Sequence, residues 1–262
     1  MASSVVVISV LLYAGFAVMA LGSVSLLYPP RFLGIPTRAR ALAVLAAGLA
    51  AALVAVLVPP PPARSGPHGA TRLDDFVPEF QFAEFHERLV RATPERVDRA
   101  LRTVTAEEIR LLRFLTWIRN PRRLWSRQPE SILNPPAAEP ILDVAKRSGF
   151  VVLADEPGRE LVLGTLVVRP RDARVSVPDD LAETGRRFAA LSAPGYAKAA
   201  MNFRIEPRPD GTCRLTTETR IFATDRDAAR RFAVYWRMIH PGSALIRAMW
   251  LRAVAERAES GR

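Results

Sequence analysis

The sequence has little of the chemistry on which most metal and catalytic sites depend. Cys213 is the only cysteine, so a disulfide within one chain is impossible and a cysteine-based zinc site is disfavoured. The three histidines, His68, His86 and His240, show no HExxH or similar ligand spacing. We therefore expect no metal ion and no cofactor.

Acidic residues are missing from the first 72 residues, which contain five arginines. The formal charge of +11 thus divides into +5 for this segment and 11 − 5 = +6 for the remainder. In the remainder, basic and acidic residues are mixed, with no lysine–arginine block and no basic run interleaved with aromatics. This pattern predicts a solvated basic surface and no nucleic-acid partner.

Two long runs contain no charged residue at all. The first, Val5–Tyr28, makes a helix of roughly 36 Å, which is long enough to cross a bilayer. It lacks the basic start of a signal peptide and is longer than a signal-peptide core. The second, Ala41–Val58, is just long enough to span, and a basic turn separates the two. Residues 1–58 are therefore predicted to form a transmembrane helical hairpin, with spans at about 5–28 and 41–58.

Small residues recur at four-residue spacing in the second run and predict the face on which the two helices approach: Ala43, Ala47 and Ala51, with Gly48 and Ala52 beside them. Two spans place both termini on the same side of the membrane. The turn contains three arginines, and the segment shortly after the second span contains two. The positive-inside rule therefore does not decide on which side of the membrane the termini lie. Residues 59–73, rich in proline and glycine, are predicted to be a linker.

Residues 74–262 alternate between strand and helix patterns and predict a second, α+β domain. The segment between 169 and 194 is the least clear and is assigned one or two short strands. The strands are expected at 75–90, 150–154, 160–168, 197–205 and 213–221, and the helices from Thr93, from Thr105, at 140–147 and at 224–259.

The last helix is the element around which this domain is organised. Thr224 is a candidate N-cap, and Pro241 predicts a break. The side opposite the apolar stripe is expected to hold most of the polar residues of the helix: Arg230, Arg237, His240, Arg247 and Arg252. Apolar residues recur at helical spacing at Phe232, Trp236, Ile239, Ile246, Trp250 and Ala253.

The order of strand, two short helices, antiparallel strands and a long final helix resembles the SRPBCC superfamily of START-like and polyketide cyclase-like helix-grip domains. The resemblance implies a bacterial branch of that superfamily, and a curved antiparallel sheet that grips the last helix around an apolar cavity. It covers residues 74–259 and is carried by Glu84–His86, Ala92–Val97, Ala100-Leu101, Gly149-Phe150, Pro157–Gly164, Tyr196–Phe203 and Thr217–Thr219.

Three functions fit this resemblance, because the fold alone does not fix one. The first is a membrane-anchored binding protein for an apolar or lipid-like small molecule. The second is a cyclase- or aromatase-like enzyme that acts through His86 or Glu160. The third is a protein-interaction module whose cavity is filled. The residues expected to contact the ligand are Met201, Phe203, Thr217, Thr219, Phe232, Trp236 and Ile239.

Overall fold

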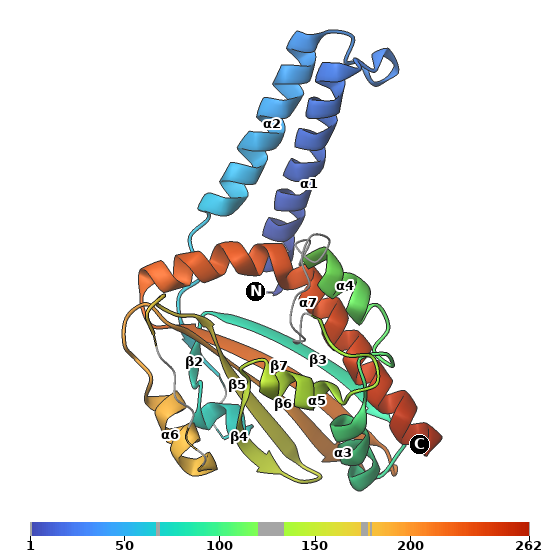
Figure 1. The fold of residues 1–262 in the computed structure, drawn as a ribbon, viewed down its shortest axis with the longest axis vertical. Coiled ribbons are helices and arrows are strands. Elements are labelled where there is room, and N and C mark those ends of the chain that lie inside the picture. The colour runs from blue at the N-terminus through green and yellow to red at the C-terminus, as the bar shows by residue number, and fades with distance from the viewer. Residues whose placement is uncertain (1, 67–68, 120–133, 174–177, 179, 262) are drawn as a thin grey trace. The chain divides into compact units, whose positions relative to one another are not determined.

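A computed structural model describes residues 2–66, 69–119, 134–173, 178 and 180–261 (Figure 1). The chain forms two compact units. The first unit comprises Met1–Pro60 together with Ala233–Pro241, and the second comprises Pro61–Phe232 together with Gly242–Arg262. Each unit has its own buried apolar cluster.

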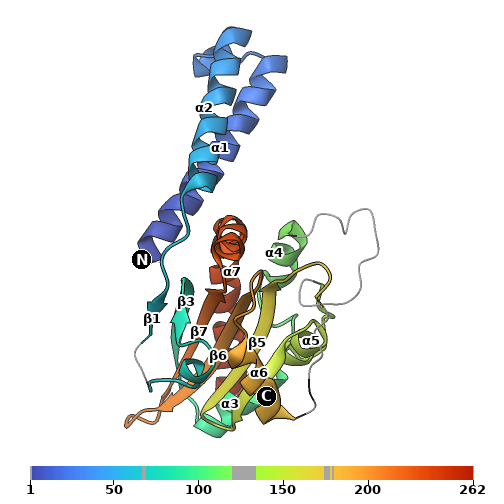
Figure 2. The same ribbon diagram turned by 90° about the vertical axis from the view of Figure 1, so that its left-hand side faces the viewer.

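The first unit contains two helices that lie side by side in both views, α1 (Ala2–Leu27) and α2 (Arg38–Leu57) (Figures 1 and 2). A short 3-10 helix, η1 (Arg31–Leu33), lies in the turn between them. Thr37 caps α2 by accepting a hydrogen bond from the Arg40 N–H, so α2 begins three residues before the predicted span. Both helices are long and apolar enough to cross a membrane, and this chain buries only 22% of each apolar window.

Glycine allows the two helices to approach closely. A Cβ atom added to Gly48 would lie 2.6 Å from the Met19 nitrogen and 2.8 Å from the Gly15 oxygen, both main-chain atoms. The predicted small-residue face is correct in part: Gly48 and Ala52 are buried, whereas Ala43 and Ala47 are exposed. The buried small residues of α2 are Ala41, Gly48, Ala52 and Ala55.

The second unit is built on a five-stranded antiparallel sheet with the strand order β3-β7-β6-β5-β4. The mixed α+β character predicted from the sequence is therefore confirmed. The strands are β3 (Phe82–Val90), β4 (Val151–Glu156), β5 (Glu160–Val168), β6 (Ala197–Pro207) and β7 (Cys213–Ala223).

The two faces of this sheet have different cores. One face, which we call the inner face, packs on α3 (Pro94–Thr103), α5 (Ile141–Arg147) and the part of α7 (Arg226–Ser260) that follows Pro241 (Figures 1 and 2). The opposite, outer face packs on other elements, among them α6 (Leu181–Ala190). The inner-face sheet residues in the core are Leu161, Leu163, Met201, Phe203, Ile205, Cys213 and Leu215.

Between 169 and 194 the structure contains α6, and the described residues of this segment, 169–173, 178 and 180–194, form none of the predicted short strands. Asp180 caps this helix by accepting a hydrogen bond from the Glu183 N–H, and an Asp followed by Glu three residues later is a recognisable start signal. The helix predicted from Thr105 begins later, as α4 (Leu112–Arg119).

The predicted strand at 75–90 divides into several elements. A 3-10 helix, η2 (Arg72–Asp75), precedes β2 (Glu79–Phe80), which pairs with β1 (Arg64–Ser65), and β3 then follows. Phe80 belongs to the outer-face core, whereas Phe82 contacts Phe232. The segment around η2 covers the sheet rather than extending it.

The last helix, α7, is continuous through Pro241, so the predicted break is absent. Its N-cap is Asp225, which accepts from the Asp227 and Ala228 N–H groups, and not Thr224. His240 is buried, which contradicts its predicted place on the polar side.

Candidate functional site

A group of polar side chains interrupts the apolar inner face. Glu84 and His86 on β3 lie opposite Thr219 and Thr217 on β7. Side chains alternate along a strand, and these positions share the side of Phe82 and Val90 on β3 and of Leu215 on β7. We call Glu84, His86, Thr217 and Thr219 the inner polar patch.

The patch contains buried polar atoms without partners. Oε1 of Glu84 lies 2.7 Å from Nε2 of His86, whereas Oε2 of Glu84 is buried and has no hydrogen-bond partner among the described residues. Oγ1 of Thr217 is also buried and also has no hydrogen-bond partner among the described residues. The Glu84 side chain is 5% exposed and Thr217 is 2% exposed. Leaving such a group unpaired costs about 1–3 kcal/mol, which a hydrogen bond to an ordered water or a bound molecule would offset.

Two residues of α7 lie on the same face. Nη1 of Arg247 donates to Sδ of Met201 at 2.6 Å, and the guanidinium lies 6.0 Å from the centre of the Trp250 ring. The Trp250 ring lies 4.9 Å from that of Phe203, and its Nε1 is buried without a partner in the described structure. Desolvation lowers the pKa of Arg247, and the Glu84 carboxylate acts in the opposite direction.

Most of the predicted ligand-contacting residues belong to this region. Met201 and Phe203 on β6 and Thr217 and Thr219 on β7 all point to the inner face, since they alternate in step with core residues of their strands. Phe232 is buried, with its ring 5.0 Å from that of Phe82.

Trp236 and Ile239, the other two predicted residues, belong to the first unit. Trp236 is buried, with its ring 5.1 Å from that of His240, and Ile239 is partly buried. Arg237, predicted to face solvent, is also buried in the first unit, where it donates to the Val56 and Val58 carbonyl oxygens.

The sequence prediction missed Arg247, which it puts on the polar side of the last helix. The structure puts it against Met201. A signal was present, because Arg247 lies three residues before Trp250 and seven after His240, and these spacings return to one side of a helix.

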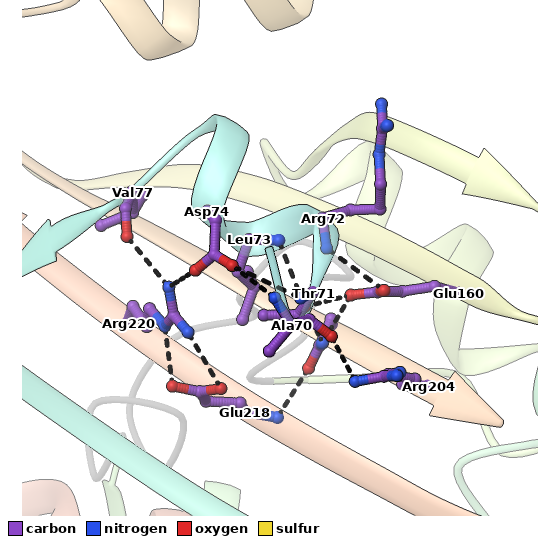
Figure 3. A network of polar contacts seen from close by, with 11 residues as sticks. Ala70, Thr71, Arg72, Leu73, Asp74, Val77, Glu160, Arg204, Glu218 and Arg220 are labelled. Atoms are coloured by element: carbon purple, nitrogen blue, oxygen red, sulfur yellow. Dashed lines mark hydrogen bonds and ion pairs between the residues drawn. The ribbon is translucent and has the colours of Figure 1, made fainter. Parts of the chain in front are cut away.

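Glu160, the other predicted acid, lies on the outer face, because its neighbour Leu161 points inward. Its carboxylate accepts hydrogen bonds from Oγ1 of Thr71 (2.5 Å), from the N–H of Arg72 (3.2 Å) and from Nδ2 of Asn202 (2.6 Å) (Figure 3). Glu160 therefore anchors the η2 segment, and it cannot act together with His86 on one bound molecule.

The outer face also holds a buried ionic cluster, shown in Figure 3. Arg220 is 1% exposed and donates to Asp74 at 2.6 Å and to Glu218 at 2.7 Å. Its guanidinium lies 4.9 Å from the centre of the Phe80 ring. A Cβ atom on Gly66 would meet this guanidinium at 2.9 Å, so glycine is needed where the chain passes over it. The cluster holds residues 69–80 against the sheet.

Lys198 is a buried cation on the outer face and gives a pH-dependent prediction. Its Nζ donates to the carbonyl oxygens of Phe188 and Ala189, at the end of α6, and burial lowers its pKa to about 8. Between this value and the ordinary pKa of about 10.4, the unfolded chain binds more protons than the folded one. The free energy of unfolding is therefore expected to rise with pH through this window, by on the order of 1–2 kcal/mol after solvent screening.

Chemical denaturation at pH 7.5, 9 and 10.5 measures this rise. Lys198→Met is expected to abolish it, whereas replacing the exposed Lys146, the other lysine of the chain, is expected to leave it intact. An equal rise in the Lys198→Met protein would contradict the assignment.

A hollow in the second unit is lined by residues of α7 and by Glu108, none of which belongs to the inner polar patch. It has a volume of about 170 Å³, below the roughly 300 Å³ at which small-molecule sites begin. Two of its polar lining residues already form an ion pair with each other, with Nη1 of Arg257 2.8 Å from Oε1 of Glu108. The lining residues are Glu108, Ala253, Glu256, Arg257 and Ser260.

No family model and no curated protein matches the chain. Two solved structures show a distant likeness. Protein MLL2253 of Mesorhizobium loti is 17% identical, with 67% of this chain and 98% of that chain covered and a TM-score of 0.29. Hypothetical protein jhp0584 of Helicobacter pylori is 11% identical, with 74% and 99% covered and a TM-score of 0.36. At these scores the likeness bears on neither fold family nor function.

Proposed function

We propose that the protein is a membrane-anchored binding protein for an apolar or lipid-like small molecule that carries a hydrogen-bonding group. The observation that carries the proposal is the inner polar patch, in which Glu84 and Thr217 keep buried, unpartnered oxygens on an apolar face. A ligand with a hydroxyl or amide group would satisfy them. The helix-grip architecture and the SRPBCC resemblance are part of the same proposal.

The two faces of the sheet support this assignment by their contrast. On the outer face, Glu160 and Arg220 make several short hydrogen bonds each, as buried polar groups in a structural role do. On the inner face, the free oxygen of Glu84 meets no donor among the described residues. Polar groups that are surrounded by apolar side chains and left unpaired are typical of ligand sites.

Membrane anchoring rests on the two apolar helices. Only six residues separate the end of α2 at Leu57 from the start of β1 at Arg64. Such a connection reaches at most about 25 Å. If α1 and α2 span a bilayer, the second unit therefore begins close to its surface, where apolar molecules are concentrated.

An enzyme of the cyclase or aromatase kind is the second candidate, and one contact favours it. The 2.7 Å hydrogen bond between Glu84 and His86 is the arrangement that orients a general base. Its reaction would take place on the inner face, with His86 as the base and Glu84 as its positioning partner. Glu160 has no part in it.

Extraction of the purified protein tests the binding function. Full-length protein, purified in a mild detergent, is extracted with organic solvent and the extract is analysed by mass spectrometry. We expect one class of apolar compound, enriched over the bulk lipid and close to one molecule per chain. Glu84→Leu is expected to reduce its amount several-fold, because the free acceptor is removed.

The matched control is Glu87→Gln, an exposed position on the same strand. It is expected to leave the extract unchanged. An extract that equals the lipid background in the parent protein, together with a Glu84→Leu protein that is more stable than the parent, would favour a filled interior and the interaction-module function instead.

A further inference from the structure

Arg247 is a partly buried cation that forms no ion pair with a described residue, and Glu84 acts on it only from a longer distance. Among the described residues no carboxylate oxygen lies within 4.0 Å of its nitrogens, and its hydrogen bond goes to the Met201 thioether, a weak acceptor. Its pKa is lowered by desolvation, yet its surface is not fully covered by the chain. A bound molecule can therefore still reach this guanidinium.

Other buried arginines of the protein have stronger partners. Arg220 pairs with two carboxylates, and Arg237 donates to main-chain carbonyl oxygens. A buried charge that lacks such a partner is costly, and a chain that retains one usually supplies the partner from elsewhere. The neighbour of Arg247 on the same helix, Trp250, adds a second buried donor, its unpartnered indole N–H.

We infer that the ligand of the inner face is an amphipathic carboxylic acid, whose carboxylate binds the guanidinium of Arg247 and the indole N–H of Trp250. This inference rests on the proposed binding function and names the class of its ligand. A guanidinium presents paired N–H donors that match the two oxygens of a carboxylate. The apolar part of the acid would pack on inner-face residues such as Phe203 and Leu163.

The position of Glu84 is compatible with an anionic ligand. In the sheet, Glu84 lies opposite Thr219, and Thr219 lies opposite Met201, so two strand spacings, or about 10 Å, separate Glu84 from Met201. One oxygen of Glu84 is already held by His86. Its other oxygen, with Thr217, remains free for a hydroxyl or amide group further along the ligand.

The test uses the full-length protein in phosphatidylcholine nanodiscs and two probes that differ only at the head, oleic acid and methyl oleate, each labelled with carbon-13 at C1. The protein-bound fraction of each probe is read from its NMR signal. We expect oleate to bind at least tenfold more tightly than the ester. Arg247→Met is expected to weaken oleate at least tenfold and leave the ester unchanged, and Trp250→Phe to weaken oleate about threefold.

The control variant is Arg252→Met, which removes a partly exposed arginine of the same helix that pairs only with Glu256. It is expected to leave both probes unchanged. Equal binding of acid and ester, or undiminished oleate binding in Arg247→Met, overturns the inference while the binding function stands. Binding of neither probe overturns both. If Arg247→Met does not fold, the inference is tested by the comparison of oleate with methyl oleate in the parent protein and by the oleate affinity of Trp250→Phe.

A carboxylate can belong to a free acid or to the headgroup of phosphatidylserine. Nanodiscs containing one fifth phosphatidylserine separate these sources. Displacement of the labelled oleate would assign the site to the lipid headgroup, and retention would assign it to a free acid.

Discussion

Asp74→Ala is expected to lower the free energy of unfolding by about 3–5 kcal/mol, one of the largest effects of a single substitution in this protein. Asp74 contributes one of the two carboxylates that hold the fully buried Arg220, and it also accepts the N–H groups of Ala70 and Thr71 at the start of η2. Its removal leaves the guanidinium with half of its partners and releases the segment that covers the outer face. Urea denaturation of the full-length protein, followed by circular dichroism, measures the loss.

Asp75→Ala is the matched control, because the neighbouring carboxylate pairs with Arg72 at the surface, with about half of each side chain exposed. Its expected cost is below about 1 kcal/mol. The double variant Asp74→Ala with Arg220→Met is expected to recover part of the loss, since it removes the buried charge along with its partner. Equal costs for the two aspartates would show that the ionic cluster does not hold the segment.

Gly48→Leu is expected to separate α1 from α2. Even a single Cβ atom at this position would approach main-chain atoms of Met19 and Gly15 to within 3 Å, and backbone cannot move aside as a flexible side chain can. With cysteines introduced at Leu12 and Ala55, both buried between the helices, the disulfide cross-linking rate reports their proximity. We expect Gly48→Leu to slow cross-linking at least tenfold.

Ala47→Leu makes a similar change in size one position away, on the exposed side of α2. It is expected to leave the cross-linking rate within about twofold of that of the protein with Gly48 and Ala47 intact. The native Cys213 is buried in the second unit and can be retained. An effect of Ala47→Leu as large as that of Gly48→Leu would restore the originally predicted face of Ala43, Ala47 and Ala51.

The candidate site shows what local sequence patterns can predict and what they cannot. Alternation along β6 and β7 put Met201, Phe203, Thr217 and Thr219 on one face, and the structure agrees. The same alternation cannot predict whether Glu160 and His86 lie on the same face of the sheet, because that depends on the register in which β5 pairs with β6. The function, the ligand and the superfamily remain proposals, since no matching family bears on them.

The sequence by itself determined what depends on neighbouring residues. Two uncharged runs specify two apolar helices, Thr93-Pro94 starts α3, Gly149 and Gly158 adopt the positive φ angles that their turns need, and Pro207 to Cys213 joins two alternating strands into a hairpin. Each of these features follows from steric, capping or hydrophobic rules that act over a few residues.

Only the tertiary structure decided what depends on distant partners. Residues 69–80, which locally resemble part linker and part strand, lie over the sheet because Arg220 and Glu160, more than eighty residues away in sequence, bind them. Arg247 turned inward for a similar reason. Its spacing to Trp250 indicates the side of the helix on which it lies, but only the packing of α7 on β6 brings the guanidinium against the Met201 thioether.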